Sequence, residues 1–136
     1  MEIRFANKED INEIIKIDRH IKRERLYDSV NKNFVYVLSE GNEIKGILRY
    51  SLFWLEHPFL DLIYLKEEVR NKGFGTLMLD KWENDMKNEG FSYVITSTQE
   101  NESAWEFYEK RGFFNKGGFY PPMQEEKELI YVKELK

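Results

Sequence analysis

The chain has 136 residues, a net charge of −4, no cysteine and two histidines. This length is typical of one domain that buries its own hydrophobic core. The lack of cysteine excludes disulfide bonds and thiolate-bound metals, the two histidines argue against a histidine-based metal site, and the negative charge argues against non-specific binding to nucleic acid. The apolar runs are far shorter than the about 20 residues that span a bilayer, and the N-terminus lacks the apolar core of a signal peptide. We therefore expect a single cytoplasmic domain covering residues 1–136.

The first half of the chain is expected to form a strand, two helices and a meander of strands. Residues 3–6 alternate weakly between apolar and polar, as in a half-buried strand. Asn7 is a typical helix N-cap, and the apolar residues after it recur at helical spacing, which predicts a helix over roughly residues 8–21. A second short helix is expected within residues 22–32. Antiparallel strands rich in β-branched and aromatic residues follow at 34–39, 44–54 and 59–65.

The second half is expected to contain two strand-to-helix units and a final pair of strands. A helix over residues 77–90 carries Leu77, Met78, Trp82 and Met86 near one face and stops at Gly90. The elements after it are a strand at 91–98, a helix at 103–111 and strands at 113–120 and 128–135. The order is therefore β-α-α-β-β-β-α-β-α-β-β. Because strands precede helices here, parallel pairing is expected beside the antiparallel meander, so the fold class is α/β (α+β) with a mixed sheet of about seven strands.

A glycine-containing loop joins the strand that ends at residue 65 to the next helix, with the sequence Arg70-Asn71-Lys72-Gly73-Phe74-Gly75-Thr76. One interpretation is a flexible, solvated turn. The other is a phosphate cradle: Gly73 and Gly75 would let an anion lie against the backbone, at a helix N-terminus whose amides have no intrahelical partner. Arg70 and Lys72 add positive charge. The position of the loop between an apolar strand and an amphipathic helix favours the cradle.

Two common nucleotide-binding motifs do not fit this loop. A P-loop would require Gly-Lys-Ser/Thr at a set spacing, and no such triplet follows. A dinucleotide-binding fingerprint would require a third glycine at the position where the chain has Met78. The sequence therefore disfavours ATP and NAD as ligands.

A second informative segment covers residues 101–113, NESAWEFYEKRGF. It places Asn101 just before a short helix and Tyr108 two turns into that helix, on the face that also carries Ala104 and Phe107. Taken alone, this pattern is that of a core helix whose tyrosine hydroxyl finds a hydrogen-bond partner.

Together the two segments resemble the GNAT superfamily of acyl-CoA N-acyltransferases. The nucleotide-loop signature of that superfamily, [RQ]-x-x-G-x-[GA], has its counterpart in residues 70–75. Its second signature, N-x-x-A-x-x-[LF]-Y-x-x-x-G-F, has its counterpart in Asn101, Ala104, Phe107, Tyr108, Gly112 and Phe113. The order of elements over the whole chain also fits the GNAT fold, in which two central strands splay apart.

The resemblance implies an N-acetyltransferase that moves an acetyl group from acetyl-CoA directly to a primary amine. In the family, the pantetheine arm of the co-substrate pairs with the strand before the loop, which here is the main chain of Ile63, Tyr64 and Leu65. The amides of residues 71–76 would hold the pyrophosphate, and Asn101 would hydrogen-bond the pantetheine arm.

Tyr108 would lie beside the thioester sulfur in such an enzyme. A phenol has a pKa of about 10, so it stays protonated at neutral pH and can protonate the CoA thiolate as it leaves. The oxyanion is expected to meet a backbone N–H of the splayed strand, from Leu65. The lack of cysteine is consistent with direct transfer, without a covalent enzyme intermediate.

The sequence offers several candidates for the general base, in contrast to the single candidate for the general acid. Some relatives, the ribosomal-protein N-terminal acetyltransferases, carry a glutamate five residues before the asparagine, where this chain has Thr96. Asp61 is the better candidate, because an acidic residue inside an apolar strand is costly to bury without a purpose. The alternative is that Asp61 faces solvent or pairs with an arginine. Glu56, His57 and a water relay are the remaining candidates.

The sequence leaves other functions and the acceptor open. One alternative is a non-catalytic acyl-CoA-binding or sensing domain, and another is a phosphate-binding module unrelated to CoA. The acceptor could be a small amine, a peptide N-terminus or a lysine side chain, and the chain a monomer or a homodimer that pairs through an exposed last strand. Six side chains could line an acceptor pocket or belong to the core: Tyr27, Trp54, His57, Phe59, Phe119 and Tyr120.

Overall fold

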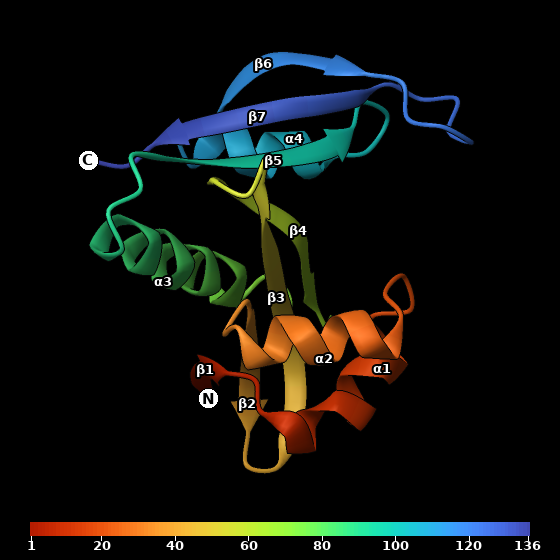
Figure 1. Cartoon of the computed structure of the whole chain (residues 1–136), viewed down its shortest axis with the longest axis vertical. Coiled ribbons are helices and arrows are strands. Elements are labelled where there is room, and N and C mark those ends of the chain that lie inside the picture. The colour runs from red at the N-terminus through yellow and green to blue at the C-terminus, as the bar shows by residue number, and fades with distance from the viewer. The chain divides into compact units, whose positions relative to one another are not determined.

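The computed structural model describes the whole chain, from Met1 to Lys136. The strands are β1 (Glu2–Phe5), β2 (Val35–Glu40), β3 (Glu43–Phe53), β4 (His57–Leu65), β5 (Tyr93–Gln99), β6 (Phe114–Phe119) and β7 (Glu128–Glu134). The helices are α1 (Ile11–Ile17), α2 (Arg23–Asn31), α3 (Phe74–Asn88) and α4 (Ala104–Lys110), with short 3-10 turns at Lys8–Asp10 and Glu67–Val69 (Figure 1). This order confirms the predicted one. No helix has both the length and the apolar character needed to cross a membrane.

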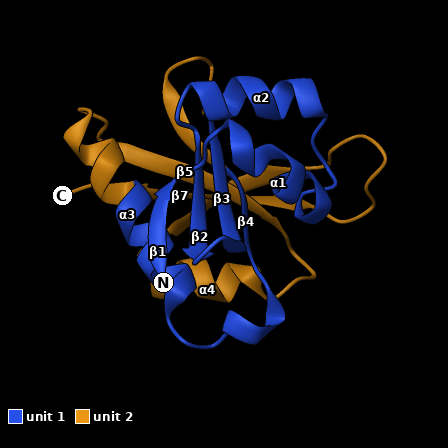
Figure 2. Ribbon diagram, turned by 90° about the horizontal axis from the view of Figure 1, so that it is seen from below, with its two compact units in different colours: residues 1–51, 61–82 blue, residues 52–60, 83–136 orange.

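The chain divides into two compact units (Figure 2). Unit 1 contains residues 1–51 and 61–82, and unit 2 contains residues 52–60 and 83–136. The division falls inside three elements, β3, β4 and α3, so each of these contributes residues to both units.

The sheet has seven strands in the order β1-β2-β3-β4-β5-β7-β6. The pairs β1–β2, β2–β3, β5–β7 and β6–β7 are antiparallel, and β4–β5 is parallel, with Phe59 opposite Ile95 and Leu60 opposite Thr96. The predicted mixed sheet is therefore confirmed.

The expectation that the last strand is an exposed edge is wrong. Strand β7 lies between β5 and β6, and β6 is the edge strand. The residues explain this order: β6 is exposed along its whole length and contains Gly117 and Gly118, whereas β7 has apolar residues that are half-buried or buried. The more apolar strand gains more by pairing on both sides.

Unit 1 has its core between helices α1 and α2 and the strands β2 and β3. Asn7 is the N-cap of the turn that leads into α1, as predicted, and forms a capping box with Asp10. The buried core residues are Ala6, Ile11, Ile14, Leu26, Val30, Val35, Val37, Ile44 and Ile47. The two helices cover one face of these strands (Figure 1, red to orange).

Helix α1 is shorter than predicted. It ends at Ile17 instead of near residue 21, because Asp18 leaves the helical conformation with φ −94° and ψ 94°. The side chain of Asp18 is buried and bonded to Arg49, 31 residues further along the chain. A local pattern of apolar residues carries no sign of such a contact, so the spacing alone predicts too long a helix.

Helix α3 begins earlier than predicted, at Phe74 inside the glycine loop. Met78, Trp82 and Met86 are fully buried as expected, but Leu77 is 52% exposed. At 3.6 residues per turn, Leu77 shares its face with the polar residues at positions 80, 81 and 84. The placement of Leu77 on the apolar face is therefore wrong.

Gly46 in β3 lies against the end of β4, within unit 1. A Cβ atom at Gly46 would lie 2.6 Å from Leu65 Cδ2 and 3.1 Å from the carbonyl oxygen of Tyr64. Next to it, the N–H of Lys66 donates a hydrogen bond of 2.8 Å to the carbonyl of Lys45. The absence of a side chain at Gly46 therefore lets the end of β4 and the Leu65 side chain lie close to β3.

Replacing Gly46 with alanine should destabilise the protein. The added methyl group would overlap the Leu65 side chain, and overpacking of this kind typically costs about 1–3 kcal/mol. Urea unfolding measures the loss, with Gly41→Asn as the control, because Gly41 has φ 60° and open space around it and asparagine tolerates this conformation. An unchanged free energy of unfolding for Gly46→Ala would contradict the packing argument.

Candidate functional site

The end of β4 is bonded to the glycine loop through Arg70. The Arg70 Nε donates a hydrogen bond of 2.8 Å to the carbonyl of Leu65, and the guanidinium lies 5.3 Å from the centroid of the Tyr64 ring. Hydrogen bonds from an ionised donor are stronger than neutral ones. Arg70 therefore holds the strand end and the loop together, in addition to the positive charge that it brings to the loop.

Two of the three loop residues between Arg70 and α3 adopt left-handed backbone conformations. Asn71 has φ 60° and Gly73 has φ 87°. A Cβ at Gly73 would meet no atom within 4 Å, so glycine is needed at this position for its conformation and not for lack of space. Asn71, Lys72 and Gly73 are all exposed, which leaves their backbone accessible to a ligand.

The N-terminus of α3 directs backbone amides toward this loop. The regular i to i−4 hydrogen bonds of α3 begin with the amide of Leu77, which donates to the carbonyl of Gly73 at 3.1 Å. The amides of residues 73–75 therefore precede the hydrogen-bond ladder of a helix that has 15 residues. The helix dipole places partial positive charge at the same point, so the arrangement suits an anion such as a phosphate.

Tyr108 on α4 is 6% exposed, in unit 2. Its ring packs edge-on against Phe107 and Phe113, with centroids 5.4 Å apart in both cases. Burial raises the pKa of the phenol, while the hydrogen bond to Thr96 acts in the opposite direction. The phenol of Tyr108 is therefore protonated at neutral pH.

Thr96 links Tyr108 to β4. The Thr96 Oγ1 donates a hydrogen bond of 3.2 Å to the carbonyl of Leu60, and the same hydroxyl is bonded to Tyr108. One threonine hydroxyl therefore joins Tyr108 of α4 to Leu60 of β4 within unit 2.

Asn101 lies in the exposed turn between β5 and α4, also in unit 2. The residues on either side of it are bonded through their backbone: Glu100 N–H donates to the carbonyl of Lys127 at 3.0 Å, and Glu102 N–H to that of Gln99 at 3.1 Å. These bonds fix the turn and leave the Asn101 side chain accessible to a ligand.

Asp61 on β4 lies beside an arginine, which was one of the two alternatives left open. Arg49 Nη1 is 3.6 Å from Asp61 Oδ2, and the Ser51 hydroxyl also bonds the carboxylate. Burial raises the pKa of Asp61, and the charge of Asp18 acts in the same direction, while Ser51 and Arg49 oppose them. The net effect is a raised pKa, which makes Asp61 a stronger proton acceptor than an ordinary aspartate.

His57, another candidate for the base, lies among aromatic side chains. The Nδ1 of His57 lies 2.9 Å from the hydroxyl of Tyr93, and the two rings stack with centroids 5.3 Å apart. His57 also contacts Trp54, and Phe53 joins Trp54 to Phe59, so these side chains form an aromatic cluster at the β3–β4 turn. His57 is therefore part of an aromatic cluster and bonded to a tyrosine.

Three residues beside Asp61 were missed by the sequence reasoning: Asp18, Arg49 and Ser51. Arg49 could have been found, because it is a charged residue inside the apolar strand that was predicted at 44–54. Asp18 and Ser51 had no such signal. The predicted residues themselves fall into two sets: Asp61, Ile63, Tyr64, Leu65 and residues 70–76 belong to unit 1, and Asn101 and Tyr108 belong to unit 2.

Several solved structures share this fold. A GNAT-family acetyltransferase from Bacillus cereus has a TM-score of 0.77 and 23% identity, over 99% of this chain and 97% of that one. PaiA N-acetyltransferase from Thermoplasma acidophilum, solved in complex with coenzyme A, has a TM-score of 0.80 and 18% identity, over 98% of both chains. The ribosomal-protein-S18-alanine N-acetyltransferase from Escherichia coli has a TM-score of 0.79 and 15% identity, over 99% and 94%. At these identities the likeness establishes the fold alone.

The chain is also similar in sequence to two proteins of Bacillus subtilis. The uncharacterized protein YxbD is 31% identical over 78 residues, which are 57% of this chain and 47% of that protein. The uncharacterized protein YdhI is 30% identical over 77 residues, or 56% and 46%. The matches thus span about half the length of these relatives.

The family model described as the acetyltransferase (GNAT) family matches residues 5–113. The match covers most of the chain, including the glycine loop, Tyr108 and the GF pair that ends the second signature. The chain therefore belongs to the GNAT family of acetyltransferases.

Proposed function

We propose that the protein transfers an acetyl group from acetyl-CoA directly to a primary amine. The observation that supports this proposal is the glycine loop at the start of α3, where the backbone of residues 71–73 is exposed and the amides of residues 73–75 precede the hydrogen bonds of the helix, an arrangement that suits a phosphate. The fold is shared with PaiA N-acetyltransferase, whose structure contains coenzyme A. Family membership supplies the reaction type.

The co-substrate would be bound along β4 and the loop. The main chain of Ile63, Tyr64 and Leu65 would pair with the pantetheine arm, and the amides of residues 71–76 would hold the pyrophosphate. Asn101 would bond the pantetheine arm through its side-chain amide. Because Arg70 and Gly46 fix the position of Leu65, they would align the strand for that pairing.

The proposed reaction forms one C–N bond and breaks one C–S bond. The acceptor enters as an ammonium ion and gives one proton to Asp61, directly or through water. The neutral amine attacks the thioester carbonyl, whose oxygen is stabilised by the N–H of Leu65. As the C–S bond breaks, Tyr108 gives its proton to the thiolate and recovers a proton from the amine nitrogen. The products are the amide, free CoA thiol and one proton released to solvent.

Binding of acetyl-CoA should raise the melting temperature, because a ligand that binds only the folded state stabilises it. Gly73→Glu should abolish this shift, since it places a negative side chain where the phosphates would lie. Gly41→Glu is the matched control, because Gly41 also has a positive φ and open surroundings but lies in the β2–β3 turn. A wild-type protein that shows no shift at saturating acetyl-CoA would refute the proposed co-substrate.

Tyr108→Phe should lower turnover about 10²–10⁴-fold, the typical contribution of a general acid, while leaving the acetyl-CoA melting shift unchanged. The matched control is Tyr131→Phe, which removes another buried hydroxyl in unit 2, one bonded to Glu109 at 2.7 Å. That control should change stability and not turnover. Normal turnover of Tyr108→Phe, with acetyl-CoA still bound, would assign Tyr108 to the core and make water the proton donor.

Cationic amines should be better acceptors than acidic amino acids such as glutamate, because the proposed base is a carboxylate on a protein of net charge −4. The measurement is CoA release, detected with a thiol reagent, over a panel of small polyamines, basic peptides and acidic amino acids. Asp61→Asn should abolish most of the rate. A preference for acidic acceptors would contradict the charge argument, and binding of acetyl-CoA without release for any amine would favour a non-catalytic acyl-CoA-binding domain.

A further inference from the structure

Three charged side chains from separate elements of unit 1 meet beside β4. Asp18 follows the last residue of α1, Arg49 lies in β3 and Asp61 lies in β4. Arg49 Nε donates to Asp18 Oδ2 at 2.8 Å, and Arg49 Nη1 is 3.6 Å from Asp61 Oδ2. We call this set the carboxylate–arginine array.

The two carboxylates of the array differ in how well they are satisfied. The side chain of Asp18 is fully buried, and its second oxygen accepts the backbone N–H of His20 at 3.3 Å. The Asp61 side chain remains 27% exposed and has only the longer contact with Arg49 and the Ser51 hydroxyl. A buried carboxylate is strongly destabilising without its partner, so Arg49 is bound primarily to Asp18.

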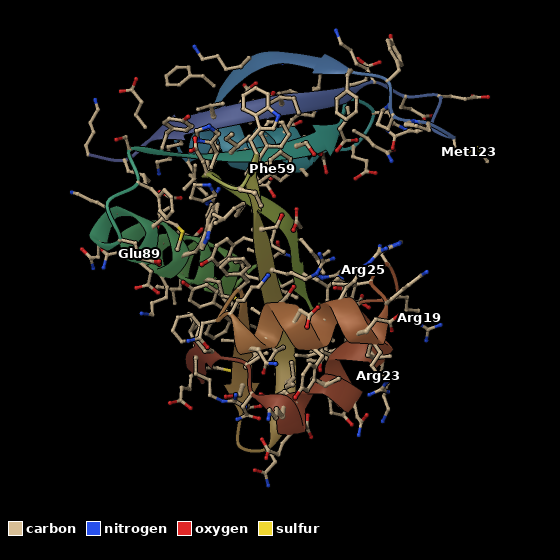
Figure 3. All side chains as sticks on the ribbon, in the orientation of Figure 1. Arg19, Arg23, Arg25, Phe59, Glu89 and Met123 are labelled. Carbon is tan, nitrogen blue, oxygen red and sulfur yellow. The ribbon has the colours of Figure 1, made fainter.

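The array is one positive charge short. Two carboxylates face a single guanidinium, so one negative charge is left over, and it is located at the exposed member, Asp61. The other arginines near Asp18 do not compensate it: Arg19, Arg23 and Arg25 extend outward where α1 connects to α2 (Figure 3). Arg19 donates to the carbonyl of Lys16, and Arg23 to the Asn12 side chain.

We propose that Asp18 and Arg49 are positioning residues that hold Asp61 ready to receive the ammonium group of the acceptor. Asp18 occupies Arg49, so that Arg49 orients the Asp61 carboxylate without neutralising it. The acceptor ammonium supplies the missing positive charge, gives a proton to the Asp61 carboxylate and becomes the neutral nucleophile. The resulting carboxylic acid returns its proton to water after the transfer. This inference rests on the proposed acetyl transfer to amines.

The array predicts opposite effects for its two positioning residues. The charged groups that face Asp61 within unit 1 are Arg49 on β3 and Asp18 at the end of α1. Asp18→Asn removes a negative charge and releases Arg49 toward Asp61, which lowers the pKa of Asp61. Arg49→Gln removes the positive charge, which raises the pKa of Asp61. Damage to the fold alone would not produce shifts of opposite sign.

The test is the pH dependence of kcat/KM for the amine with the highest rate in the acceptor panel. Asp61 must be ionised to accept a proton, so the acidic limb of the profile follows its pKa in the free enzyme. We expect the limb to move by about 1 pH unit, to lower pH in Asp18→Asn and to higher pH in Arg49→Gln. The KM for the amine should also rise in Asp18→Asn, because Arg49 then competes for Asp61.

A matched control separates the array from general destabilisation. Asp10→Asn removes another buried carboxylate of unit 1, one paired with Arg4 at 2.7 Å, and should lower stability without moving the limb. Because Arg49→Gln leaves the buried Asp18 unpaired and can unfold the protein, the double variant Asp18→Asn/Arg49→Gln provides a neutral pair of similar shape. Its limb should lie between those of the two single variants.

A titration of the Asp61 carboxyl carbon by NMR, assigned with Asp61→Asn, measures the same pKa without activity. Limbs or titrations that coincide with the wild type in both single variants, or that move in the same direction, would overturn the array while leaving acetyl transfer intact. Absence of CoA release with every amine would overturn the proposed function instead, and in that case the NMR titration decides whether the array controls Asp61.

Discussion

The hydrogen bond between Arg70 and the carbonyl of Leu65 is the contact on which the proposed co-substrate site depends. A strand that ends freely would let the following loop take many conformations, at a cost of about 1–2 kcal/mol per residue when a ligand ordered it. Here the charged guanidinium fixes the strand end, and the Tyr64 ring lies beneath it. The loop therefore leaves β4 in one direction, and α3 begins with its amides facing the loop.

The same strand end is fixed from the side of β3, where Gly46 leaves room for Leu65. The two constraints act on different atoms, since Arg70 holds the carbonyl and Gly46 accommodates the side chain. Together they define the position of the Leu65 backbone, including the N–H that we propose for the oxyanion. Preorganised donors of this kind contribute to catalysis because they need no rearrangement during the reaction.

The order of elements and the two signature segments could be predicted from the sequence because their signals are local. Helical spacing, the Asn7 cap and the glycines of residues 73–75 each act over a few residues. The contacts that were missed join distant positions, as Asp18 and Arg49 do across 31 residues. The same reason applies to β7, whose place between β5 and β6 follows from the burial of whole strands and not from its own pattern.

Thr96 bears on the different surroundings of the proton acceptor and the proton donor that we propose. Its hydroxyl donates to the Leu60 carbonyl and also bonds Tyr108, and the phenol keeps its proton because burial raises its pKa. A carboxylate at position 96 would add a charge beside that phenol and would leave the Leu60 carbonyl without its donor. We therefore propose as the base a residue with access to solvent. Asp61 directly follows Leu60 in β4, and burial raises its pKa. Arg49 is paired with Asp18, so the negative charge of Asp61 is not neutralised. Burial raises the pKa of both groups, which keeps the phenol protonated and makes the partly exposed carboxylate a stronger proton acceptor, as the proposed acid and base roles require.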